Sequence, residues 1–192
     1  HERLALARRE ADALPLGSGA VAGTSYPIDV DQLAIDLGFS RVVDNSIDAS
    51  SDRDFAVTFL YACPLAMVHL SRLAEDLIVF CGAGHRFFEL SDRVSTGSSM
   101  MPQKKNPDPL ELVRGKTGRA LGHLVHLLTL LKGLPSGYNK DLQEDKHAVF
   151  DAEDTLAGCL SVAGAVVAGL SLNRDVAAAA ASGMLLATDV AD

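Results

Sequence analysis

The chain has 192 residues, of which 48% are hydrophobic, and its formal net charge at pH 7 is −8. This length suffices for one sizeable domain, and the acidic balance argues against nucleic acid as the main partner. No uncharged apolar run reaches about 18 residues, so we expect no membrane span and assign the excess apolar surface to contacts between subunits.

The three cysteines are widely spaced and lie in apolar segments, at Cys63, Cys81 and Cys159. Without a CxxC pair or a disulfide pattern, they are typical of buried thiols in a cytoplasmic protein. No signal or transit segment opens the chain. The chain opens within a helical pattern without Met and stops within another at Thr188–Asp192, so we expect an internal piece of a longer protein.

The first part of the chain predicts two helices joined by a loop. Residues 1–13 are rich in the strong helix formers Ala, Leu, Arg and Glu. The Gly- and Ser-rich stretch Leu14–Pro27 is a loop. A second helix is expected from Asp29 to near Gly38, with Gln32 at the capping-box position.

A polar stretch, Asp44–Asp54, separates these helices from a long apolar helix predicted over Phe55–Cys81. Pro64 should kink that helix or end its first part, because proline removes a helical hydrogen bond. Another long helix is predicted over Pro109–Lys132, with Asp108 as its N-cap and Glu111 closing a capping box.

Small residues within this helix, at Gly115, Gly118 and Gly122, should allow another helix to approach closely. A last long helix is expected from Asp141, capped together with Glu144, to about Leu172. A short Ala-rich helix follows over Asp175–Ala181 and should end at Gly183.

Three long helices with short connections, and no alternating β pattern, imply an all-α helical bundle. Apolar faces wider than one stripe imply that bundles pack against other bundles in an oligomer. We expect a central helical-bundle domain over residues 1–172 and the start of a small C-terminal helical domain over residues 173–192.

The segment Ser91–Leu112 concentrates groups that can carry chemistry. Gly97, Ser98 and Ser99 form a small, hydroxyl-bearing run, and two lysines follow it before a helix start. A serine becomes a base only where a cation and oriented N–H donors lower its pKa, and this segment can supply both. The alternative is an ordinary surface loop with solvated lysines.

For each of three other polar sites, the sequence allows a functional and a structural interpretation. Gln143 and Lys146, three residues apart, could grip a carboxylate together or belong to a solvated first turn. Arg53 could form a structural ion pair or clamp an anionic substrate. His123 and His126 share helical spacing but have no third ligand nearby, which favours surface histidines over a metal site.

The sequence Gly97-Ser-Ser-Met-Met-Pro-Gln-Lys-Lys-Asn-Pro107 resembles the GSSxMPxKxNP signature of the fumarase/aspartase superfamily. Flanking stretches such as LPLGSGAVAGTSYPID and LKGLPSGYNKDLQEDK resemble the argininosuccinate lyase family within it, and the resemblance covers essentially the whole chain. It implies a long-helix homotetramer with active sites assembled from three subunits, a small-molecule substrate, and no metal or organic cofactor.

The resemblance also implies a reaction and a role for each matching residue. The reaction would be reversible β-elimination of argininosuccinate to arginine and fumarate. Ser98 would be the base, with Ser99 as the alternative, and Lys104 would stabilise the serine alkoxide and the carbanion. Glu111 would orient a catalytic histidine on another segment. The matching substrate-binding positions are Arg53, Asn106, Tyr138, Gln143 and Lys146.

The family's helper histidine and N-terminal substrate-binding residues have no counterpart in these 192 residues, so we expect this chain alone to be inactive. Two rival functions remain. One is another lyase of the superfamily, such as aspartase, fumarase or adenylosuccinate lyase. The other is a structural protein like the crystallins of bird and reptile lenses. The serine loop is shared among these, whereas the segment Tyr138–Lys146 favours argininosuccinate lyase.

Overall fold

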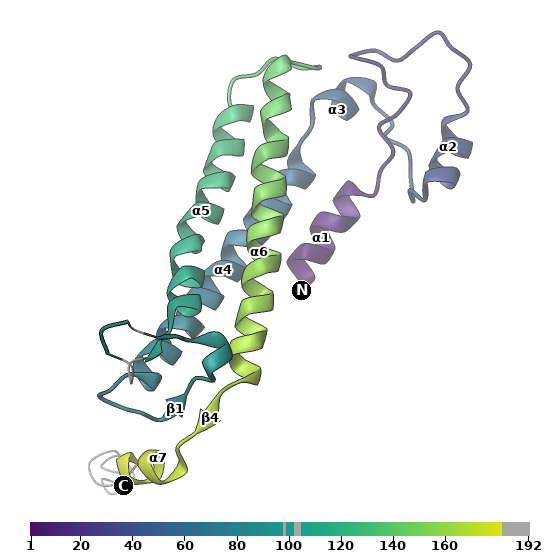
Figure 1. The fold of residues 1–192 in the computed structure, drawn as a ribbon. Helices are drawn as coiled ribbons and strands as arrows, with labels where there is room; N and C mark the ends of the chain where they lie inside the picture. Colours follow the sequence, from purple (N-terminus) through teal and green to yellow (C-terminus); the bar gives the residue numbers. More distant parts are fainter. Residues whose placement is uncertain (98, 102–104, 182–192) are drawn as a thin grey trace, which may run out of the picture. The chain divides into compact units, whose positions relative to one another are not determined.

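The computed structural model describes residues 1–97, 99–101 and 105–181. The largest elements of this part are three long helices, α4 (Asp54–Cys81), α5 (Asp108–Leu131) and α6 (Asp145–Ala168), with 28, 24 and 24 residues (Figure 1). The shorter helices are α1 (Glu2–Ala11), α2 (Val30–Leu37), α3 (Ser46–Ser51), α7 (Arg174–Ala180) and the 3-10 turns η1 (Asp92–Val94) and η2 (Lys140–Glu144). The predicted all-α class is confirmed.

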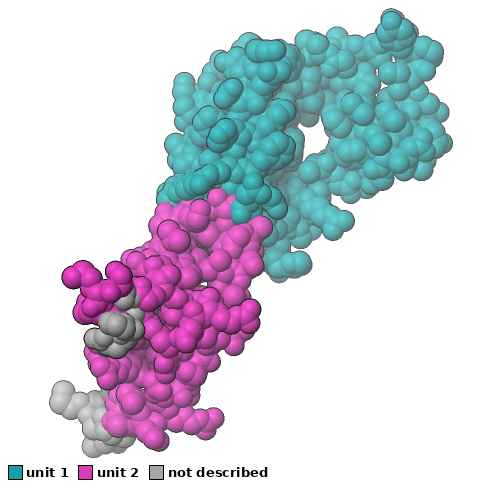
Figure 2. Space-filling model, in the orientation of Figure 1, with its two compact units in different colours: residues 1–65, 118–154 teal, residues 66–117, 155–192 magenta. Residues whose placement is uncertain are grey.

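The chain divides into two compact units, which Figure 2 shows in different colours. Unit 1 comprises residues 1–65 and 118–154, and unit 2 comprises residues 66–117 and 155–192. Since each long helix runs from one unit into the other, each unit contains a segment of α4, of α5 and of α6. These two units divide the long helices and do not test the predicted domain boundary after residue 172, which stays a prediction.

Each unit has an apolar core of its own. Burying one such side chain fully contributes about 1.5–3 kcal/mol, so the helix faces that carry them hold the units together. The largest fully buried side chains are Leu14, Leu60, Cys63, Leu127 and Leu142 in unit 1, and Met67, Leu110 and Val166 in unit 2.

Helix α2 begins and ends where its sequence predicts. The Asp29 carboxylate accepts a hydrogen bond from the Gln32 N–H at 2.9 Å, and Gly38 ends the helix in the left-handed region with a φ of 78°. The other half of the capping box does not form. The Gln32 amide instead donates to Asp36 at 2.8 Å, because residues four apart are neighbours on a helix surface.

Helix α5 begins differently from its prediction. The Pro107 carbonyl accepts hydrogen bonds from the N–H groups of Leu110 and Glu111, at 2.9 and 3.1 Å, so Pro107 occupies the cap position. The Asp108 carboxylate accepts a hydrogen bond from the Thr96 hydroxyl. The predicted capping box between Asp108 and Glu111 is therefore wrong, because a tertiary partner engages this carboxylate.

The helix predicted over residues 141–172 is shorter at both ends. Its first turn is the 3-10 turn η2, in which the Leu142 N–H donates to the Asn139 carbonyl, so the capping box of Asp141 and Glu144 is wrong. At the other end α6 stops at Ala168, and the chain continues into β4 (Ser171–Leu172).

Four strands of two residues each were not predicted, because two residues are too few to show an alternating pattern. Strand β1 (Phe88–Glu89) pairs antiparallel with β4. Strands β2 (Thr96–Gly97) and β3 (Lys105–Asn106) also pair antiparallel, with Gly97 opposite Lys105. This second pair holds the two sides of the serine segment together.

Two expectations about helix interiors have mixed outcomes. Helix α4 continues through Pro64, so the proline does not end its first part, and buried neighbours such as Leu60 and Met67 outweigh a cost of about 3 kcal/mol. The kink at Pro64 stays a prediction. A Cβ added at any of the three glycines of the α5 stripe, Gly115, Gly118 and Gly122, would meet no described atom of this chain within 4 Å beyond its own stretch of helix. Close approach of another helix at these glycines is therefore not seen within the described chain, and approach by a second chain stays a prediction.

Helix α4 is the one described helix long and apolar enough to cross a membrane. Length and composition alone are weak grounds, because the core helix of a soluble protein meets the same criterion. Leu60, Cys63 and Met67 on α4 are fully buried within the chain, whereas Tyr61, Val68 and Val79 on the same helix are exposed.

The N-cap of α2 can be tested by mutation. Asp29→Ala should cost this helix about 1 kcal/mol because the Gln32 N–H loses its acceptor. Hydrogen–deuterium exchange at the Gln32 amide should then be roughly fivefold faster. Asp29→Asn keeps a side-chain acceptor and is the control. Equal exchange in Asp29→Ala and the unmodified protein would contradict the assigned cap.

The cysteines differ in reactivity. Cys63 and Cys159 are buried as predicted, whereas Cys81 is partly exposed. Burial raises the pKa of Cys63 to about 11, so almost no thiolate forms there near neutral pH. At about pH 8, a thiol reagent should modify Cys81 first and leave Cys63 unmodified, as mass spectrometry of digests would show. Unfolded protein, in which all react, is the control; equal native rates would contradict the burial pattern.

Candidate active site

The predicted site residues fall into two described groups. Unit 1 contains Arg53, Tyr138, Gln143 and Lys146, and unit 2 contains Asn106 and Glu111. Ser98 and Lys104, the predicted base and its cationic partner, lie outside the described residues.

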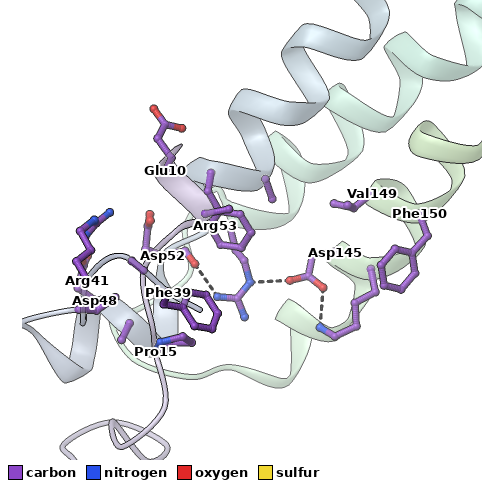
Figure 3. A pocket seen from close by; sticks show the side chains of 17 residues that line it. Glu10, Pro15, Phe39, Arg41, Asp48, Asp52, Arg53, Asp145, Val149 and Phe150 are labelled. Atoms are coloured by element: carbon purple, nitrogen blue, oxygen red, sulfur yellow. Dashed lines mark hydrogen bonds and ion pairs between the residues drawn. The ribbon is translucent and has the colours of Figure 1, made fainter. Parts of the chain in front are cut away.

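Arg53 and Lys146 line one cavity of about 510 Å³ in unit 1 (Figure 3). Its wall combines apolar rings with charged groups, and it draws on α1, α3, the start of α4, and α6. A cavity with convergent polar groups on an apolar lining suits a small charged ligand. Besides the two predicted cations, its ionisable lining residues are Glu10, Arg41, Asp48, Asp52 and Asp145.

Asp145 links the two predicted cations (Figure 3). Its Oδ2 accepts a hydrogen bond from Arg53 Nε at 2.6 Å, and its Oδ1 accepts one from Lys146 Nζ at 2.8 Å. Burial by itself raises the pKa of Asp145, but the hydrogen bonds from Lys146 and Arg53 outweigh it, so the pKa lies below its usual value. Sequence reasoning missed Asp145, because nothing in the pattern Glu-Asp-Lys indicates burial.

Arg53 occupies the turn that starts α4. Its carbonyl accepts the first helical hydrogen bonds, from Ala56 and Val57, and its Nη1 donates to the Asp52 carbonyl at 2.6 Å. Only 15% of its side chain is exposed. The structural ion pair that was one interpretation of Arg53 is thus present, whereas substrate clamping stays a prediction.

Tyr138 and Gln143 contact each other, whereas a shared grip of Gln143 and Lys146 on a carboxylate stays a prediction. Gln143 Nε2 donates to the Tyr138 hydroxyl at 3.1 Å. Gln143 lies in the 3-10 turn η2, while Lys146 lies in α6, so the three-residue spacing spans two kinds of helix. Gly137, with a φ of 90°, allows the backbone to turn immediately before Tyr138.

Asn106 and Glu111 line a second cavity, of about 650 Å³, in unit 2. Lys105 lines it as well and donates to two carboxylates, Asp92 at 2.8 Å and Glu89 at 3.2 Å. These hydrogen bonds, that to Asp92 first, raise the pKa of Lys105. Lys105 is thus engaged by carboxylates that join β3 to the segment around β1.

Arg86 lines the same cavity in an unusual backbone conformation, with a φ of 52°. Its N–H donates to the Gly82 carbonyl at 2.9 Å, and its carbonyl accepts from the Asn173 side chain at 2.8 Å. A left-handed residue other than glycine is uncommon and is often found at functional sites. No sequence signal distinguishes Arg86 from a surface arginine.

His123 is not the surface histidine predicted from sequence. Only 16% of its side chain is exposed, and its Nε2 forms a hydrogen bond with Asp151, which also pairs with Arg119. The hydrogen bond from Arg119, followed by that from His123, lowers the pKa of Asp151. This cluster joins α5 to α6 within unit 1. Its partners come from two helices far apart in sequence, so local patterns could not show it.

Comparison with known proteins extends the sequence resemblance. A family model described as "Lyase" matches residues 1–122. The argininosuccinate lyase of Pelotomaculum thermopropionicum is 55% identical over 192 residues, which is 100% of this chain and 42% of that protein. The argininosuccinate lyase of a Sulfurihydrogenibium species is 55% identical over 181 residues, 94% of this chain and 39% of that protein.

A solved structure of EDDS lyase in complex with formate has a TM-score of 0.83 and 30% identity, over 91% of this chain and 35% of that one. The chain spans about two fifths of the length of the curated relatives it matches. The family model includes the Gly97–Pro107 motif within its matched residues. The resemblance seen in that motif is thereby confirmed, and the chain belongs to this lyase family.

Proposed function

We propose that the whole protein to which this chain belongs is an argininosuccinate lyase, which cleaves argininosuccinate reversibly to arginine and fumarate. The observation that carries this proposal is 55% identity to an argininosuccinate lyase over all 192 residues. Identity to the solved EDDS lyase is 30%. The 55% match covers both groups of candidate site residues as well as the serine segment. This higher identity supports argininosuccinate lyase over other lyases that share the serine segment.

The most difficult step of the proposed reaction is the one in which negative charge accumulates on the substrate. A base removes a proton from Cβ of the succinyl group, and the electron pair is delocalised into the neighbouring carboxylate. The C–N bond then breaks, fumarate forms, and the departing nitrogen of arginine takes up a proton. We assign the base to Ser98, and to Lys104 the stabilisation of the alkoxide and of the carbanion. Both of these assigned groups are side chains, so the proposal includes no metal or organic cofactor.

We assign substrate-binding roles to five residues that the structure describes. Argininosuccinate carries several carboxylates, and Lys146 and Arg53 place two cations at one cavity. Tyr138 and Gln143, already hydrogen-bonded to each other, offer a hydroxyl and an amide. These four and Asn106 would bind substrate, while Glu111 would orient a histidine contributed by another segment.

We further propose a cytoplasmic homotetramer whose active sites combine residues of three subunits. Support comes from large apolar side chains that the single chain leaves exposed along its long helices, together with the α5 glycine stripe that faces no described atom. Such surface is typical of an interface between subunits. Exposed examples are Tyr61, Val68 and Val79 on α4, Leu112, Leu121, Val125 and Leu128 on α5, and Leu160, Val162 and Val167 on α6.

Substrate assays separate the proposal from its rivals. The full-length protein should release fumarate, followed by its ultraviolet absorbance, from argininosuccinate and not from adenylosuccinate, aspartate or malate. The present 192-residue chain alone should release none, because the helper histidine and the N-terminal binding residues are missing from it. Robust turnover by this chain would contradict the shared site. A folded full-length protein inactive on every substrate would favour the crystallin-like alternative.

Paired serine variants test the proposed base. Ser98→Ala in the full-length protein should lower kcat by about 10²–10⁴-fold, the usual contribution of a general base. Ser99→Ala is the matched control and should lower kcat far less. Light scattering should show the same oligomer for both variants. Near-normal turnover in Ser98→Ala, with loss in Ser99→Ala, would move the role to Ser99.

A further inference from the structure

We propose that Asp145 is a positioning residue that holds Lys146 and Arg53 in place at the unit 1 cavity. This inference rests on the proposed function, in which those two cations bind a substrate carboxylate. Asp145 would act through its neighbours and would not itself touch the reacting atoms.

The first argument is geometric. Each oxygen of the Asp145 carboxylate has a different cation, Arg53 Nε at 2.6 Å on Oδ2 and Lys146 Nζ at 2.8 Å on Oδ1. Consecutive residues on a helix point in different directions, so the Lys146 side chain must fold back to reach its neighbour. The ion pair therefore restricts the conformations of the flexible Lys146 side chain, which is 59% exposed while it is paired.

The second argument concerns rigidity. Only 8% of the Asp145 side chain is exposed, and the residue lies where the 3-10 turn η2 passes directly into α6. Arg53 is equally confined, since its Nη1 donates to the Asp52 carbonyl at 2.6 Å. A buried carboxylate between two fixed helix starts is thus a firm anchor for the more mobile lysine.

The third argument concerns charge. Two cations and one carboxylate leave the trio with a net positive charge, which favours an anionic ligand beside it, although Glu10, Asp48 and Asp52 also line this cavity. An ammonium has three N–H donors, so the pair with Asp145 leaves donors on Lys146 for a ligand. Without Asp145, Arg53 and Lys146 would lose the carboxylate that they share, and their mutual repulsion would favour conformations that hold them farther apart.

Asp151 offers a matched control on the same helix. It also pairs with two cationic or polar partners, Arg119 and His123, and 18% of its side chain is exposed. It does not line the unit 1 cavity. Asp145→Asn and Asp151→Asn therefore each remove one paired carboxylate at nearly constant volume, and only the first change lies at the cavity.

In the full-length protein, Asp145→Asn should raise the KM for argininosuccinate on the order of tenfold, with a smaller fall in kcat, because the binding cations are displaced. Asp151→Asn should lower the midpoint of thermal unfolding and leave KM unchanged. An unchanged or lower KM in Asp145→Asn, or an equal rise in both variants, would overturn the proposal.

Asp145→Glu separates position from charge and guards against a variant that does not fold. It keeps the negative charge but lengthens the side chain by one methylene. A positioning role predicts that thermal stability is largely retained while KM remains raised. Return of both quantities to the wild-type values would assign Asp145 a purely structural role and overturn the proposal.

A readout independent of turnover distinguishes this proposal from the proposed function. Acylation of Lys146, measured by mass spectrometry relative to the exposed Lys140, should be faster in Asp145→Asn than in the wild type and unchanged in Asp151→Asn. An unchanged ratio in Asp145→Asn would overturn the restraint on Lys146. Absence of argininosuccinate cleavage by the wild type would instead overturn the proposed function, and the labelling ratio would still decide the restraint.

Discussion

Burial of apolar faces along α4, α5 and α6 is the interaction on which the other features of the structure depend. Each unit encloses its own set of fully buried side chains, such as Leu60 and Leu127 in unit 1 and Met67 and Val166 in unit 2. Each long helix supplies residues to both units. Packing of this kind explains why α4 runs through Pro64 in spite of the local cost.

Charged side chains in unit 1 depend on that packed frame. Asp145 binds partners at the starts of α4 and α6, and Asp151 joins α5 to α6. Asp145 could not reach Arg53, and Asp151 could not reach Arg119 and His123, unless the helices already lay side by side, because these partners are remote in sequence. Once paired, a poorly hydrated carboxylate resists displacement, since removing one partner leaves an uncompensated charge. The ion pairs therefore refine positions that apolar burial has set approximately.

In unit 2, backbone pairing and ion pairs hold the loops in place. Short strand pairs, the Lys105 ion pairs and the left-handed turn at Arg86 connect its loop segments, beside ring contacts such as that of Phe87 with Phe80. Backbone pairing suits this task because it needs no particular side chain. It brings Gly97 opposite Lys105. Asn106, beside Lys105, is placed at the cavity by the same pairing.

The sequence by itself determined the helix class, the approximate extents of the long helices, the cap of α2 and the family, because these depend on composition, periodicity and short motifs. It did not determine the starts of α5 and α6. At α5, for example, Asp108 accepts a hydrogen bond from the distant Thr96. Only the tertiary structure decided that Asp145 is buried between Arg53 and Lys146, and that His123 pairs with Asp151. The reason is physical: burial and ion pairing depend on which groups meet across helices, and one segment's pattern contains no information about its distant partners.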